Sequence, residues 1–105
     1  MLNINNIDAV IEIDNQYLIL IEYKYEDAPI PTTQQLLLER LCDNWQGKSI
    51  ALKVSHNSTE GKVPLSDCTV TQYYYQHQWH DRNTPFTTAI AQIAHNWGVE
   101  KLLPK

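Results

Sequence analysis

Two acidic residues and a lysine near the start of the chain are the residues best suited to chemistry. Asp8 is followed fourteen positions later by Glu22-Tyr23-Lys24, and the apolar run 17–21 lies between them. Ionised side chains are rarely buried unless they are paired or bind a metal, so packing alone explains such charges poorly. Two carboxylates that converge make a hard oxygen site, which suits Mg²⁺ or Mn²⁺.

A lysine beside such a site suits the hydrolysis of a phosphodiester. Glu22 and Lys24 are two residues apart on an expected strand, and alternate side chains point to the same face. A metal lowers the pKa of its bound water, while the ammonium group of Lys24 orients or activates the nucleophile. The alternative is that Glu22 and Lys24 form a solvated ion pair at a frayed strand end.

The connection between the first two strands decides whether Asp8 can join this site. A two-residue turn at Asp14-Asn15 would set Asp8 opposite Ile21, on the wrong face of the sheet. A connection of three or five residues, or a bulge, would set Asp8 opposite Glu22 with both side chains on one face. A metal site therefore predicts an odd-numbered loop or a bulge in this hairpin.

The hydrophobic pattern predicts an α/β fold in which a mixed central β-sheet is flanked by helices. Strands are expected at 7–13, 16–25, 49–55, 68–75 and 78–80, with a turn at Gln76-His77. The strand at 49–55 follows a strand and a helix, so it can run parallel to the strand at 16–25.

Two helices are expected against this sheet. The first is capped by Thr32 or Thr33 and runs to about Trp45, and the second begins at Thr84-Pro85 and closes at Gly98. The residues of the first helix that should face the sheet are Leu37, Leu38, Leu41, Cys42 and Trp45.

Length and composition indicate one domain over residues 1–105. The chain has 43% hydrophobic residues and a formal charge of −4, which argues against coating nucleic acid by bulk electrostatics. The spacing of Cys42 and Cys68 does not match a metal-binding motif, so both are predicted to be buried free thiols. No signal peptide or apolar run long enough to cross a membrane is present, so we expect a soluble cytoplasmic protein without a membrane partner.

The segment 7–55 resembles the PD-(D/E)xK superfamily of restriction-endonuclease-like nucleases, which includes Holliday junction resolvases. The resemblance rests on Asp8, Glu22-Tyr23-Lys24 and Gln34 in the first turn of the following helix. It implies a β-β-α-β nuclease core, Asp8 and Glu22 as ligands of Mg²⁺ or Mn²⁺, Lys24 as the catalytic lysine and Gln34 beside the site. It further implies a metal-dependent endonuclease that acts on DNA, and we expect a homodimer because one subunit offers little surface.

One departure from the superfamily supports a second interpretation. Only seven residues precede Asp8, too few for the helix whose glutamate usually supports the site, and Glu12 is the acidic residue that could replace it. The alternative function is therefore an inactive nuclease-fold module of a phage or mobile element that acts through a protein partner.

An aromatic cluster near the end of the chain admits two interpretations. It could stack on single-stranded or distorted nucleic acid, or it could divide between the second face of the sheet and a subunit interface. The second interpretation would also suit a purely structural dimer. The cluster comprises Tyr73, Tyr74, Tyr75, Trp79, His80 and Arg82.

Overall fold

The computed structural model describes residues 7–26, 28–58 and 63–103 and has a mixed α/β fold with five strands and two helices. The strands are β1 (Ala9–Ile13), β2 (Tyr17–Tyr25), β3 (Lys48–His56), β4 (Thr69–Tyr75) and β5 (Gln78–Pro85). The helices are α1 (Thr32–Asp43) and α2 (Phe86–Trp97), and short 3₁₀ turns lie at Leu65–Asp67 and Glu100–Leu102. The expected fold class is confirmed at this level.

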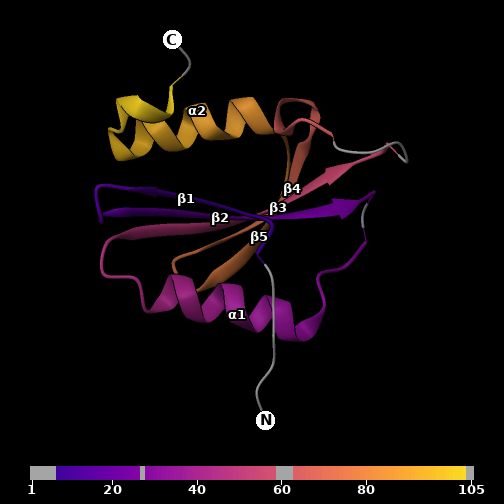
Figure 1. Cartoon of the computed structure of the whole chain (residues 1–105), viewed down its shortest axis with the longest axis horizontal. Helices are drawn as coiled ribbons and strands as arrows, with labels where there is room; N and C mark the ends of the chain where they lie inside the picture. The colour runs from indigo at the N-terminus through magenta and orange to yellow at the C-terminus, as the bar shows by residue number, and fades with distance from the viewer. Residues whose placement is uncertain (1–6, 27, 59–62, 104–105) are drawn as a thin grey trace.

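The five strands form one mixed sheet in the order β1-β2-β3-β4-β5. β2 and β3 are parallel and α1 connects them, whereas the other neighbours are antiparallel. α1 lies against one face of the sheet and α2 against the other (Figure 1). The parallel pairing expected for the strand at 49–55 is therefore confirmed.

β2 lies between α1 and α2 and is buried on both faces of the sheet, as its continuous apolar run predicts. Ile19 and Ile21 pack with α2 in one cluster of core residues. Leu18 and Leu20 pack with α1 in the other. The alternation continues to Glu22, which therefore points to the α1 face of the sheet at the end of the apolar run.

The β1–β2 hairpin has the odd-numbered connection that was predicted for a metal site at Asp8 and Glu22. Ile13 pairs with Tyr17, which leaves Asp14, Asn15 and Gln16 as a three-residue loop. Asp14 and Asn15 adopt positive φ angles of 53° and 59°, a conformation that Asp and Asn tolerate better than most residues. The two-residue alternative, with Asp8 on the wrong face, is thus excluded.

The helix starts differ from those expected. Proline occupies the position before each helix, Pro31 for α1 and Pro85 for α2, and neither helix has a side-chain cap. Thr32 and Thr33 therefore do not cap α1, and Thr84 belongs to β5. The tertiary pairing of β5 with β4 overrides the local capping pattern because it satisfies the backbone of that segment.

The end of α1 and its sheet-facing residues also need correction. α1 ends at Asp43 rather than Trp45, and Leu41 is exposed although Leu38 and Cys42 are buried. Leu41 lies at the edge of the helix stripe formed by Gln34, Leu38 and Cys42, so its side chain reaches solvent. Within the described residues Cys42 and Cys68 are buried free thiols, as expected.

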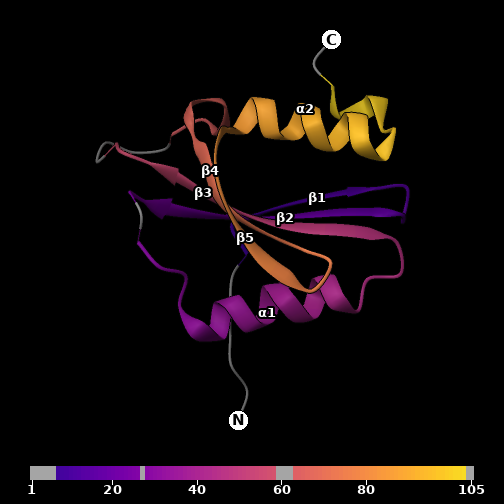
Figure 2. The ribbon, with the colours of Figure 1, turned by 180° about the vertical axis from the view of Figure 1, so that it is seen from behind.

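The twist of the sheet brings the β4–β5 hairpin toward α1 (Figure 2). The Tyr74 hydroxyl donates to both carboxylate oxygens of Asp43, at 2.8 and 3.1 Å, and so connects β4 to the end of α1. Burial and this carboxylate raise the pKa of Tyr74 to about 12.

Among the described residues, no helix is long and apolar enough to span a membrane.

Candidate active site

Asp8, Glu22, Lys24 and Gln34 converge on the α1 face of the sheet. Asp8 directly precedes β1, and the register that pairs Ala9 with Ile21 continues Asp8 to a position opposite Glu22. The backbone N–H of Tyr23 donates to Asp8 Oδ2 at 2.8 Å. The backbone N–H of Asp8 donates to Glu22 Oε1 at 3.4 Å. The two carboxylates are therefore neighbours across the hairpin.

Glu22 is the buried centre of this group. Only 3% of Glu22 and 8% of Gln34 are exposed, and Gln34 Nε2 donates to Glu22 Oε1 at 2.8 Å. Gln34 is in the first turn of α1, so the helix holds the amide over the end of β2. This hydrogen bond fixes the orientation of the carboxylate, which is the role that outer residues take at metal sites.

Lys24 lies beside Glu22 as the alternation of β2 predicts. Its Nζ is 3.9 Å from Glu22 Oε2, and the Lys24 side chain retains 22% exposure. A pair between a buried carboxylate and a partly exposed ammonium differs from the frayed, solvated pair considered from the sequence. The ammonium group can reach an anion that approaches from solvent while staying beside the carboxylate.

Burial raises the pKa of Glu22 above its ordinary value. The hydrogen bond from Gln34 opposes this effect, and the nearby charge of Asp8 adds to it. The backbone N–H of Asp8 and the charge of Lys24 also favour the ionised form. The net direction is upward because burial outweighs the groups that favour the ionised form.

Asp8 and Glu22 could hold a divalent cation, but they are only two carboxylates. Across the described residues, no group of three or more His, Cys, Asp or Glu side chains is placed to bind a metal. Glu12 does not join the site, because its Oε2 accepts a hydrogen bond from the backbone N–H of Asn15 at 2.8 Å. Its role is to close the hairpin loop, and the expectation that it replaces a third acid is wrong.

Lys53 belongs to the same region, although the sequence alone does not single it out. Lys53 is only 4% exposed and is the direct partner of Glu22 in the parallel pairing of β2 with β3. Its position between Leu52 and Val54, inside an apolar strand, is the signal that could have revealed it. A buried lysine next to a buried glutamate is a feature that packing does not require.

These charges are part of a polar row that crosses β2 to β5 and reaches Asp8, the residue before β1. Lys53 pairs with Gln72 on β4, and Gln72 pairs with Asp81 on β5. Gln72 Nε2 also donates to Asp81 Oδ1 at 3.1 Å. The row lies at the edge of the apolar core cluster that packs beneath α1. From Lys53 it continues toward β1 through Glu22 and Asp8.

The aromatic cluster does not form one surface. Tyr74 and Trp79 pack on the α1 face, with ring centroids 5.3 Å apart, whereas Tyr73 and Tyr75 pack against the core on the α2 face. The division between the two faces follows from the alternation of β4. A continuous stacking surface built from the whole cluster is therefore excluded.

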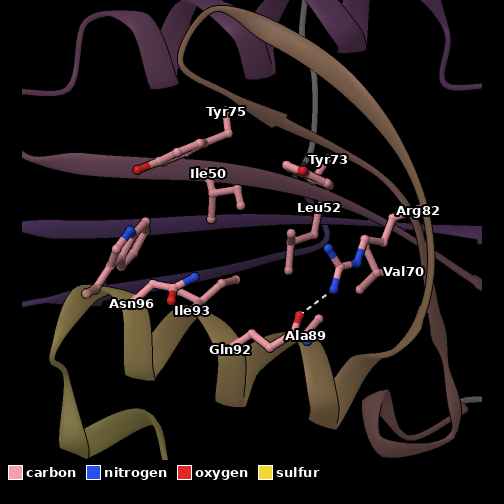
Figure 3. A pocket seen from close by; sticks show the side chains of 11 residues that line it. Ile50, Leu52, Val70, Tyr73, Tyr75, Arg82, Ala89, Gln92, Ile93 and Asn96 are labelled. Carbon is pink, nitrogen blue, oxygen red and sulfur yellow. Dashed lines mark hydrogen bonds between the residues drawn. The ribbon is translucent and has the colours of Figure 1, made fainter.

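The α2 face has a hollow of its own, of about 230 Å³ (Figure 3). Tyr73, Tyr75 and apolar residues of the core line it, and Arg82 crosses it to donate from Nη2 to Gln92 Oε1 at 2.6 Å. Its lining includes no carboxylate. The hollow therefore lacks the acidic groups that the α1 face brings together.

No protein-family model, curated protein or solved structure matches this chain significantly.

Proposed function

We propose that this protein is a metal-dependent nuclease with a restriction-endonuclease-like core, which hydrolyses DNA phosphodiesters. The convergence of Asp8, Glu22, Lys24 and Gln34 supports the proposal most strongly. These residues come from β2, α1 and the position before β1, and they meet at one end of an otherwise apolar strand. The cost of burying Glu22 is difficult to account for unless the carboxylate has a function.

Each residue has a distinct role in this proposal. Asp8 and Glu22 would hold Mg²⁺ or Mn²⁺, which supplies an activated water and stabilises negative charge on phosphate. Lys24 binds the phosphate or orients the attacking water from the exposed side of Glu22. Gln34 is a positioning residue that keeps the Glu22 carboxylate directed toward Asp8.

Cleavage of branched, nicked and linear DNA with Mg²⁺ or Mn²⁺ tests the proposal. We expect Glu22→Gln and Lys24→Gln each to lower the cleavage rate by about 10²-fold or more, as when a group that stabilises transition-state charge is removed. Gln34→Ala should cost about 10–100-fold because it disturbs a ligand rather than removing one.

Glu12→Gln provides the matched control, because Glu12 is a carboxylate on the same face of the hairpin outside the site. It should cleave as the wild type does. Equal activity of wild type, Glu22→Gln and Lys24→Gln would overturn the proposal, since contamination by another nuclease would then explain the cleavage.

The second candidate function is an inactive nuclease-fold module that acts through a protein partner. The observation that favours it is the small number of acidic groups, since the described residues bring only Asp8 and Glu22 together. Calorimetry separates the two candidates. Binding of Mn²⁺ that depends on Glu22 supports the enzyme, and absence of binding supports the inactive module.

A further inference from the structure

A polar cleft of about 840 Å³ lies next to the candidate active site on the α1 face. Its floor includes Lys53 and Gln72 from the polar row, and its walls include Gln35 of α1 and Trp79 of β5. We propose that this cleft binds an unpaired nucleotide of the DNA strand, next to the phosphodiester that is cleaved. The inference rests on the proposed function and names the class of substrate for the same site.

The location of the cleft follows from irregular pairing at the far side of the sheet. The register between β3 and β4 shifts at Lys53/Val54, and the register between β4 and β5 shifts between Val70 and Gln72. Bulges of this kind bend a strand and interrupt its ladder, and they are frequent next to active sites. The bulged Thr71 lines the cleft, so the hollow occurs where the sheet departs from regular pairing.

Lys53 is placed to bind the phosphate of that nucleotide. It lines the cleft on one side and is the strand partner of Glu22 on the other. Neighbouring strands lie about 4.8 Å apart, so Glu22 and Lys53 are adjacent on one face of the sheet. A phosphate held at Lys53 would therefore belong to the same strand segment as the phosphate beside Glu22 and Lys24.

Trp79 is placed to stack on the base. Its ring is half-buried, packs against Tyr74 on one side and contributes to the cleft wall. Its Nε1 donates to Glu39 Oε2 at 2.8 Å, which fixes the indole plane. An oriented aromatic ring stacks on any base and is a common element of single-strand binding sites.

The amide side chains around the cleft suit the polar edge of a base. Gln35 lies on the α1 wall and Gln72 on the floor beside Asp81, and the exposed Asn83 lies at the bulged part of β5. Amides offer both donors and acceptors. A base within a duplex is already stacked and paired, so this cleft can accept only a nucleotide that is unpaired or has been extruded.

Binding of short oligodeoxynucleotides in Ca²⁺, measured by fluorescence anisotropy, tests the inference. We expect the single strand to bind at least about fivefold tighter than the blunt duplex, because stacking on Trp79 requires an exposed base. Lys53→Gln should weaken single-strand binding about tenfold and reduce the slope of log K against log salt by about 0.7, since one phosphate contact is lost. Trp79→Ala should weaken it about tenfold with the slope unchanged, and Trp79→Phe should restore binding.

Lys48→Gln is the matched control, because Lys48 is an exposed lysine at the opposite end of β3. It removes the same charge and should leave both affinity and salt slope as in the wild type. If Lys53→Gln does not fold, as judged by circular dichroism, Lys53→Arg and the two Trp79 variants test the nucleotide site instead. Lys53→Arg keeps the charge and should keep the slope.

Equal affinity for duplex and single strand, or a Lys53→Gln variant that behaves like Lys48→Gln, would overturn the inference. Cleavage of duplex DNA by a wild type that does not prefer the single strand would overturn it while leaving the proposed nuclease function intact. Single-strand binding that depends on Lys53, without cleavage in Mg²⁺, would support the nucleotide site and overturn the nuclease.

Discussion

At the scale of single residues, Glu22 is the clearest case of a side chain whose environment disfavours its ordinary state. It is a carboxylate at 3% exposure whose pKa is raised chiefly by burial. Residues selected only for stability rarely occupy such positions, because a neutral isostere would be less costly there. Because the pKa of Glu22 is raised and Asp8 lies beside it, a bound cation would strongly stabilise the ionised form of Glu22.

Replacement of Glu22 by glutamine should stabilise the protein at neutral pH. Between the ordinary carboxyl pKa of 4.5 and the higher pKa of folded Glu22, the folded state binds more protons than the unfolded state. The stability of the wild type therefore falls as pH rises through this window. At a pH above both pKa values, each unit by which the pKa of Glu22 is raised lowers the free energy of unfolding by about 1.4 kcal/mol.

Urea unfolding at pH 4 and pH 7 measures this effect. Relative to the wild type, Glu22→Gln should gain more stability at pH 7 than at pH 4. A Glu22→Gln protein less stable than the wild type at pH 7 would indicate that Lys24 and Gln34 stabilise the carboxylate more than burial penalises it.

At the scale of elements, the β1–β2 loop and the start of β3 are joined through Gln16. Its carbonyl accepts the backbone N–H of Lys48 at 2.9 Å and the indole N–H of Trp45 at 3.1 Å. Gly47 passes so close to this carbonyl that a Cβ built there would lie 1.8 Å from the Gln16 oxygen. The hairpin loop, which sets the register of Asp8, is therefore held by a contact that requires glycine.

Gly47→Ala should destabilise the protein by about 3 kcal/mol, the upper end of the range for overpacking, because a backbone atom cannot rotate away. Denaturant unfolding gives the size of the effect. Amide hydrogen exchange at Lys48 should also accelerate, since its hydrogen bond to Gln16 is displaced.

Gly98→Ala is the comparison, because Gly98 has a φ of +69° but no atom within 4 Å of an added Cβ. It should cost about 1–2 kcal/mol from backbone strain alone and leave Lys48 exchange unchanged. An effect of Gly47→Ala no larger than that of Gly98→Ala would show that the loop can shift without loss.

At the scale of the whole molecule, metal binding and folding should be coupled. Mn²⁺ that binds only the folded protein raises the free energy of unfolding by about 2.7 kcal/mol at a hundredfold excess over Kd. The ligand must be ionised, so this gain should shrink as pH falls through the raised pKa of Glu22. A thermal shift that is present in the wild type and Glu12→Gln but absent in Glu22→Gln is the expected result, and a shift of equal size in all three would place the metal elsewhere.

The size of the molecule bears on its assembly. Its longest extent is 35 Å, about one turn of duplex DNA, so under the proposed function one copy would contact only a short stretch. We expect a homodimer, and Val10, Leu36 and Leu41 are exposed apolar residues that association could cover. Sedimentation equilibrium should give twice the monomer mass of 12.2 kDa, and a mass that stays monomeric at high concentration would contradict the expectation.

The local pattern of the sequence was sufficient for much of the site on β2. The apolar run places β2 in the core, and alternation places Glu22 and Lys24 on one face. The need for Asp8 to oppose Glu22 predicts an odd-numbered loop, which the structure contains. The position of Gln34 near the end of β2 could also be predicted, because a short connection places the first turn of the next helix at that end of the strand.

Tertiary structure alone decided the position of Lys53, the polar row and the cleft. Lys53 is separated from Glu22 by thirty-one positions, and its pairing depends on how α1 packs while it connects two parallel strands. The register shifts between Lys53 and Val54 and between Val70 and Gln72 depend on several strands fitting together. The start of α2 at Phe86 depends on the sheet in the same way, because Thr84 and Pro85 pair with β4. Periodicity along a chain determines which face a side chain takes, whereas its neighbours across the sheet are determined by the packing of the whole core.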